Sequence, residues 1–175
     1  IKQVPFIKTR DMLTLSNNQH SKLTRVTISA TNNHMSSQSS TSKDLFLLDK
    51  PEELAEHLIK ALDKANYRIY IFSRCLNPIF FNNESVLDAV SVTARRSRRS
   101  DIKILVEQPQ RIVDVNHKLL KLSQRLPSKI AIQKITTEPP DDYEFVIIDN
   151  DKIWLQHKED IYTGFTNYDA RPEVK

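Results

Sequence analysis

Apolar positions from residue 50 onward recur first at helical and then at strand spacing. One run with intervals of three and four residues predicts the buried face of a helix, and it consists of Leu54, Leu58, Ala61, Leu62 and Ala65. Asp49 followed by Glu52 has the pattern of a capping box, with Pro51 in the first turn. This pattern predicts that the helix begins next to an Asp49 cap.

Further helices and strands follow in alternation. Asn83 is a typical N-cap for a second helix, and Pro127 is expected to end a third helix over 114–126. Apolar runs predict strands at 67–72, 102–106 and 128–135.

Two short apolar runs near the C-terminus predict a β-hairpin. The runs 145–148 and 153–155 are separated by the turn formers Asn150 and Asp151. Because both runs are apolar on both faces, we expect this hairpin in the middle of a sheet. Crossover helices imply parallel pairing of the earlier strands. The segment order therefore predicts an α/β fold with a mixed, mostly parallel sheet flanked by helices.

The first 43 residues have a different composition. Residues 1–15 alternate apolar and polar side chains, which favours a strand, and residues 16–43 are rich in Ser, Asn, Thr and Gln with one short apolar stretch at 23–28. We expect 1–15 to be the terminal strand of a preceding domain, 16–43 a flexible linker, and 44–175 the α/β domain.

Composition narrows the possible chemistry. The 175 residues are 39% hydrophobic and 27% charged, with a formal net charge of +4. A single glycine, Gly164, excludes glycine-rich nucleotide loops, and a single cysteine, Cys75, excludes an internal disulfide. We therefore expect no cofactor and no metal site. Without an apolar run of about 20 residues or a signal pattern, the sequence predicts a cytoplasmic protein with no membrane span.

Two groups of basic residues are candidates for binding phosphate. The first stands at the end of the second predicted helix and in the next strand, and consists of Arg95, Arg96, Arg98, Arg99 and Lys103. The second lines the third predicted helix, and consists of Lys118, Lys121 and Arg125. Guanidinium groups suit bidentate phosphate contacts, so nucleic acid or another polyanion is a candidate partner. The alternative is a solvated helix end whose cations are favoured by the helix dipole.

The hairpin and its flanks, DDYEFVIIDNDKIWLQ at 141–156, resemble the active-site hairpin of the phospholipase D superfamily. In that superfamily a His-x-Lys pair opens the first strand and an Asp follows five residues after the Lys. Aligned on Asp149, this chain has Asp142 at the His position and Glu144 at the Lys position. The resemblance implies that the nucleophile and the phosphate-binding Lys are missing, while Asp149 remains at the position of the Asp that orients the imidazole.

The superfamily's Gly-Ser-x-Asn element is matched loosely by Gly164 and Asn167, later in the chain than its usual spacing. Several carboxylates around the hairpin would also repel an anionic phosphodiester. The resemblance implies a half-domain, since such folds contain two halves that are fused or paired as a homodimer.

A narrower resemblance covers ARRSRRSDIKILV, HKLLKLSQRLPS, the hairpin and GFTNYDAR. These segments resemble an uncharacterised bacterial domain that often follows a GNAT-type acetyltransferase domain. This resemblance implies an acetyltransferase-like domain upstream in the same chain, and the absence of Met at position 1 fits such a fragment.

Three functions remain open. We expect a non-catalytic phospholipase D-like domain that binds or scaffolds phosphate-bearing polyanions. The second hypothesis is a phosphodiesterase or nuclease with a non-standard site around His117, with Asp149 as a further catalytic candidate. The third is a homodimerisation module.

Overall fold

The computed structural model describes residues 44–136, 143–157 and 162–170. The strand predicted at 1–15, the linker at 16–43 and the motif position Asp142 lie outside the described residues.

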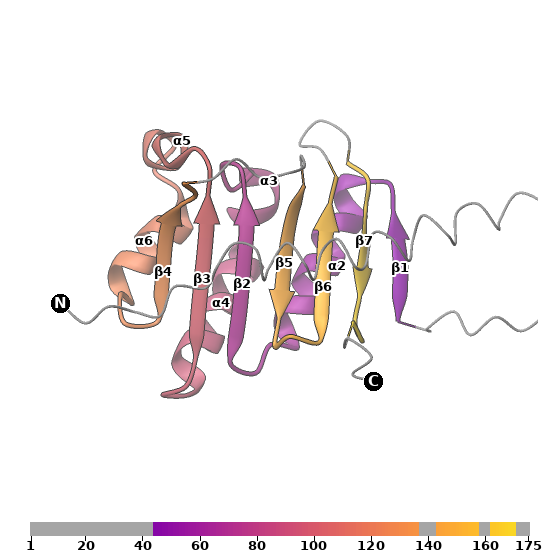
Figure 1. The fold of residues 1–175 in the computed structure, drawn as a ribbon, viewed down its shortest axis with the longest axis horizontal. Helices are drawn as coiled ribbons and strands as arrows, with labels where there is room; N and C mark the ends of the chain where they lie inside the picture. Colours follow the sequence, from indigo (N-terminus) through magenta and orange to yellow (C-terminus); the bar gives the residue numbers. More distant parts are fainter. Residues whose placement is uncertain (1–43, 137–142, 158–161, 171–175) are drawn as a thin grey trace, which may run out of the picture. The chain divides into compact units, whose positions relative to one another are not determined.

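Seven strands form one sheet in the order β1-β7-β6-β5-β2-β3-β4 (Figure 1). The strands are β1 Leu45–Leu48, β2 Arg68–Ser73, β3 Asp101–Val106, β4 Ile130–Lys134, β5 Glu144–Ile148, β6 Lys152–Gln156 and β7 Gly164–Asn167. The α/β class and the mixed sheet are confirmed, and β5 and β6 form the predicted central hairpin.

Parallel pairing is confirmed for the strands predicted at 67–72, 102–106 and 128–135, and a mostly parallel sheet is wrong. Strands β2, β3 and β4 are parallel, because helices cross over between them. The other four pairs are antiparallel. A short turn joins β5 to β6, and such a turn can link only antiparallel strands.

The helices are α2 Pro51–Asp63, α3 Pro78–Phe81, α4 Glu84–Arg96, α5 Pro109–Asp114 and α6 Lys118–Arg125. Asn83 caps α4 as predicted, because its side chain accepts a hydrogen bond from Ser85 N at 2.9 Å. The Asp49 capping box is wrong. The N-cap of α2 is Lys50, which has extended backbone as expected before Pro51 and makes no side-chain cap bond.

The single helix predicted at 114–126 is wrong, because the chain forms α5 and α6 instead. Asn116 has φ of 50°, a left-handed conformation that breaks the helix. His117 then caps α6. Strands β1 and β7 and the short helix α3 were not predicted either, since four-residue elements carry little periodicity.

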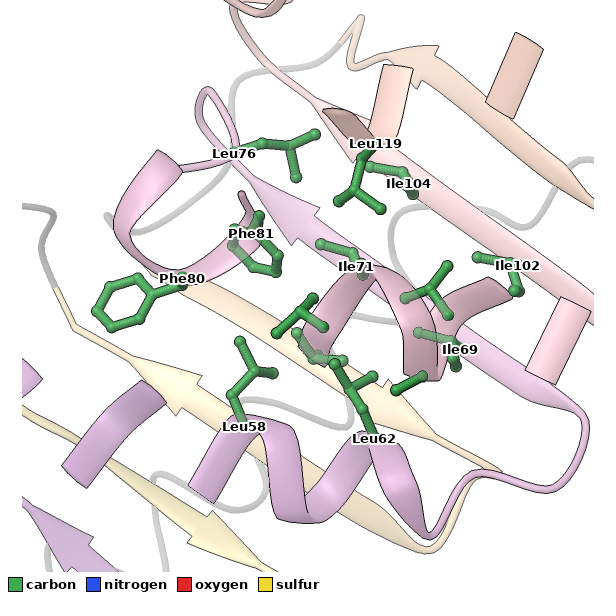
Figure 2. Packing of buried hydrophobic residues seen from close by; sticks show 14 of the residues in the cluster. Leu58, Leu62, Ile69, Ile71, Leu76, Phe80, Phe81, Ile102, Ile104 and Leu119 are labelled. Carbon is green, nitrogen blue, oxygen red and sulfur yellow. The ribbon is translucent and has the colours of Figure 1, made fainter. Parts of the chain in front are cut away.

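Figure 1 shows α2, α4 and α6 behind the sheet, and the main core lies between these helices and the strands. Figure 2 shows Leu58 and Leu62 of α2 facing Ile69 and Ile71 of β2. The buried Trp154 of β6 donates a hydrogen bond from Nε1 to the carbonyl oxygen of Leu54 at 2.9 Å. This bond satisfies the indole N–H and ties α2 to the sheet.

The opposite face of the sheet is apolar as well. Phe72, Phe145, Leu155 and Phe165 are cross-strand neighbours in one row over β2, β5, β6 and β7. The rings of Phe72 and Phe145 stack with their centroids 4.9 Å apart. Two apolar faces explain why the hairpin strands show continuous apolar runs rather than alternation.

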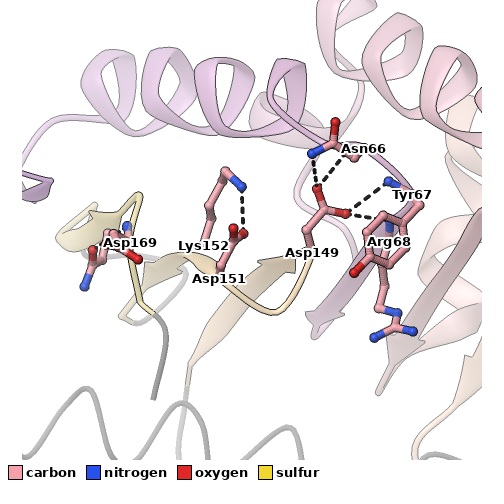
Figure 3. Close-up of polar contacts among 8 residues, drawn as sticks. Asn66, Tyr67, Arg68, Asp149, Asp151, Lys152 and Asp169 are labelled. Atoms are coloured by element: carbon pink, nitrogen blue, oxygen red, sulfur yellow. Dashed lines mark hydrogen bonds and ion pairs between the residues drawn. The ribbon is translucent and has the colours of Figure 1, made fainter. Parts of the chain in front are cut away.

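Asp149 fastens the hairpin to the start of β2 (Figure 3). Its Oδ1 accepts hydrogen bonds from the backbone N–H groups of Tyr67 and Arg68 at 3.0 and 2.9 Å. Its Oδ2 accepts bonds from Asn66 N at 2.7 Å and Asn66 Nδ2 at 3.1 Å. Burial acts to raise the pKa of Asp149, but these hydrogen bonds outweigh it and lower the pKa below its ordinary value.

We expect Asp149→Ala to destabilise the domain by about 2–4 kcal/mol, because three backbone N–H groups lose a charged acceptor. The folded-state pKa is lowered, so this stabilisation is present above the ordinary Asp pKa and is lost as pH falls through the folded value. Urea unfolding from neutral to acidic pH measures both effects.

Asp151→Asn is the matched control, since the Asp151 side chain pairs with the neighbouring Lys152 at the hairpin turn. It should change the free energy of unfolding by less than about 1 kcal/mol. Equal losses for the two variants would contradict the role assigned to Asp149.

Candidate functional site

Two of the phospholipase D motif positions, Glu144 and Gly164, lie at the same end of the sheet. Glu144 opens β5 and pairs with Gln156 of β6, and Gln156 pairs in turn with Gly164 of β7. On the other side of Glu144 lies Ser73, the last residue of β2. We call this end of the sheet, defined by these four residues, the motif end.

Glu144 holds the turn that follows β2. Its side chain is buried, and Oε1 accepts hydrogen bonds from Ser73 Oγ at 2.8 Å and from Arg74 N at 3.2 Å. Ser73 Oγ in turn accepts a bond from Leu76 N at 2.8 Å. A carboxylate therefore stands at the superfamily's phosphate-binding Lys position and is used to fix a backbone turn.

The residues of the loosely matched Gly-Ser-x-Asn element have structural roles in β7. A Cβ at Gly164 would stand 2.0 Å from the carbonyl oxygen of Leu155, so the closeness of β6 requires glycine here. Asn167 is buried, and its Oδ1 accepts a hydrogen bond from Asp169 N at 2.9 Å. These contacts explain the presence of Gly164 and Asn167 at their positions without a bound ligand.

Asp149 lies at the other end of β5 from Glu144, a full five-residue strand away. The role implied by the resemblance, orienting a catalytic imidazole, has no counterpart in its contacts. Among the described residues, the side-chain hydrogen bonds of Asp149 all go to residues 66–68.

His117 is a buried helix cap. Its side chain is 0% exposed, and Nδ1 accepts a hydrogen bond from Leu119 N at 3.2 Å. Burial lowers the pKa of His117 to about 4, although a backbone hydrogen bond to Leu76 acts in the opposite direction. The imidazole is therefore neutral near pH 7 and is placed to fix the start of α6 rather than to meet a substrate.

A basic surface forms at the end of the sheet opposite the motif end. Helices α4 and α6 each precede a parallel strand, so both finish at the end where β3 and β4 begin. We call this surface the basic edge, and it consists of Arg95, Arg96, Arg98, Arg99, Arg125 and Lys129.

The five arginines of the basic edge are exposed, and none forms an ion pair with another residue in the described part of the chain. Lys129 Nζ donates to the carbonyl oxygens of Ser97 and Arg98 at 3.0 and 2.7 Å. Lys129 was missed from the sequence, because only the crossover path places it beside the end of α4. Ser97 has extended backbone, so Arg99 lies outside α4 and does not share a helix face with Arg95.

The other predicted basic residues lie elsewhere. Lys103 pairs with Asp101 at 3.2 Å and lies 5.5 Å from the Tyr70 ring centroid. Lys118 stands at the start of α6 and pairs with Glu84. Lys121 is exposed in the middle of α6. The predicted binding residues therefore do not form one surface.

Over residues 44–136, 143–157 and 162–170, no group of three His, Cys, Asp or Glu side chains is arranged to hold a metal ion. In the same part of the chain, every helix is too short or too polar to cross a membrane.

Solved structures with similar folds have low sequence identity to this chain. The archaeal chromatin protein TrmBL2, described as showing a novel mode of DNA binding, aligns with a TM-score of 0.51 and 12% identity over 93% of this chain and 58% of its own. Phosphatidylserine synthase from Haemophilus influenzae Rd KW20 aligns with a TM-score of 0.51 and 13% identity over 74% of this chain and 34% of its own. NucT from Helicobacter pylori aligns with a TM-score of 0.46 and 16% identity over 72% of this chain and 84% of its own.

This chain thus spans less than two thirds of the chromatin protein and of the synthase. A comparison with curated proteins gave no match. The α/β layers, the mixed sheet and the similarity to the synthase establish a phospholipase D-like fold. Residues 50–175 match the family described as "Domain of unknown function (DUF7931)", and the chain belongs to this family.

Proposed function

We propose that this domain is a non-catalytic phospholipase D-like module that binds phosphate-bearing polyanions through its basic edge. The observation that carries the proposal is the convergence of α4 and α6, which gathers six cationic side chains at one end of the sheet. The motif end, where the superfamily places its nucleophile and Lys, has a buried carboxylate at Glu144.

The helix dipole alone does not account for these cations. Dipole stabilisation acts on groups next to the last carbonyl groups of a helix. Arg95 and Arg96 lie in the last turn of α4, where the dipole favours them, whereas Lys129 donates to the carbonyl oxygens of Ser97 and Arg98, which follow the helix. Arg98 and Arg99 stand beyond the helix end and are exposed. Unpaired guanidinium groups on an exposed loop favour phosphate contacts.

The chromatin protein with a similar fold is described as a DNA-binding protein, which supports nucleic acid as one polyanion to test. The resemblance of residues 94–171 to the domain that follows GNAT-type acetyltransferases supports an acetyltransferase-like domain upstream in the same chain. In the full-length chain, the module would hold an upstream acetyltransferase-like domain near its polyanion.

A homodimerisation module is the second candidate function, and strand β1 favours it. β1 is an edge strand of four apolar residues, with Leu47 66% and Phe46 41% exposed. Natural edge strands usually contain a Lys, a Pro or a bulge that blocks pairing. An antiparallel pair centred on Leu47 of two copies would place Asp44 of each copy opposite Lys50 of the other. This arrangement gives complementary charges at both ends of the new pair.

We expect no hydrolysis of bis(p-nitrophenyl) phosphate or single-stranded DNA by the purified domain, because Glu144 is already bonded to Ser73 and Arg74 and provides no positive charge for the phosphate. Release of p-nitrophenol and of acid-soluble nucleotides measures it. Turnover that co-purifies with the domain and disappears in Glu144→Ala would defeat the non-catalytic proposal.

We expect polyanion binding to weaken steeply with salt, and the double variant Arg95→Gln/Arg99→Gln to bind more weakly than wild type. Each phosphate contact contributes about one unit to the slope of log K against log salt concentration, so the slope should fall by about two. Heparin titrations at several salt concentrations provide the measurement.

Lys50→Gln/Lys60→Gln is the matched control, because it removes the same charge from two exposed lysines, one at the N-cap of α2 and one within the helix. It should leave the salt slope close to the wild-type value. If the two double variants lose affinity and slope equally, binding depends on net charge rather than on the basic edge.

We expect Leu47→Lys to abolish any self-association of the domain. In a pair centred on this position, the new lysine would be buried against the same lysine of the second copy. Light scattering across a concentration series gives the molar mass. A wild-type domain that remains monomeric at about 100 μM would contradict the dimerisation candidate, because its association free energy would then be weaker than about −5.4 kcal/mol.

A further inference from the structure

Tyr67 is an exposed aromatic residue beside the basic edge. It immediately precedes β2, and its side chain is 39% exposed. The carbonyl oxygen of Tyr67 accepts a hydrogen bond from Asp101 N at 2.9 Å. Because Asp101 follows Arg98 and Arg99 closely in the chain, this bond places the tyrosine next to the arginine-bearing loop.

Arg68 adds a further cation beside this ring. Its Cζ lies 5.4 Å from the ring centroid of Tyr67 and 5.7 Å from that of Tyr70. Figure 3 shows the Tyr67 ring and the Arg68 side chain next to each other. Arg68 forms no ion pair with a described residue. Its guanidinium group therefore retains donors for a phosphate.

Two carboxylates lie near the same place, and both are already engaged. The oxygens of Asp149 accept the N–H groups of residues 66–68. Asp101 pairs with Lys103 at 3.2 Å and accepts a hydrogen bond from the Tyr70 hydroxyl group at 3.2 Å. The groups left to meet a ligand are the Tyr67 ring and the guanidinium groups of Arg68, Arg98 and Arg99.

We propose that the basic edge takes single-stranded nucleic acid, with one base stacked on Tyr67 and the adjoining phosphates on Arg68, Arg98 and Arg99. This inference rests on the proposed polyanion-binding function and specifies its ligand. An aromatic ring among cations suits a strand whose bases are free to stack. Heparin has the charge but no bases, and a duplex keeps its bases stacked inside.

The test compares wild type with Tyr67→Ala, Tyr67→Leu and Tyr67→Phe. The labelled probes are fifteen-residue oligo(dT), oligo(rU) and heparin, measured by fluorescence anisotropy at one salt concentration. Thermal unfolding confirms that each variant is folded. Leu keeps an apolar side chain without an aromatic face, and Phe keeps the ring without the hydroxyl group.

We expect Tyr67→Ala and Tyr67→Leu to weaken oligo(dT) and oligo(rU) binding by about tenfold, the effect of losing one stacked base. Heparin binding should stay at the wild-type level in both variants. Tyr67→Phe should bind all three probes as wild type does.

Two results would overturn the inference. If Tyr67→Leu binds both oligonucleotides as tightly as wild type, or loses oligonucleotide and heparin binding equally, no base stacks on this ring, and the polyanion-binding function can still stand. If wild type binds none of the three probes at low salt, the proposed function itself fails. The heparin measurement therefore separates the two failures.

Discussion

The carboxylate of Asp149 holds the junction on which the sheet depends. Strand β2 pairs with β3 in parallel on one side and with β5 in antiparallel on the other, so it joins the two halves of the sheet. The Asp149 oxygens accept the backbone N–H groups at residues 66–68, just where β2 begins. This contact fixes the hairpin register against β2, and a one-residue slip would turn the apolar faces of β5 and β6 over.

The same register determines what stands at each end of the sheet. With β5 antiparallel to β2, Glu144 falls beside Ser73 and its carboxylate closes the turn after β2. The parallel half sends both crossover helices to the other end, where Lys129 joins the end of α4 to the start of β4. The motif end thus contributes to stability, and the exposed charge is at the basic edge.

Sequence patterns anticipated the features that depend on local spacing. The hairpin, the α2 stripe and the Asn83 cap follow from periodicity and from the preference of short polar side chains for N–H groups. The contacts of His117 and Lys129 could not be anticipated in this way, because each depends on partners fixed by tertiary structure. In the sequence, Tyr67 has the pattern of an ordinary strand residue. Its exposure suggests a binding role only because the tertiary structure places the arginine-bearing loop 97–100 beside it.

The length of the strands separates the charge of the basic edge from the Glu144 carboxylate at the motif end. A six-residue strand such as β2 extends about 20 Å, at about 3.3 Å per residue. At physiological ionic strength, charges are screened over about 8 Å, so Glu144 hardly reduces the potential around Arg98 and Arg99. The carboxylates of Asp101 and Asp149 lie at the same end of the sheet as these arginines, and both already accept hydrogen bonds. A buried carboxylate at the motif end and exposed cations at the basic edge are therefore compatible in one sheet, because neither end constrains the charge of the other.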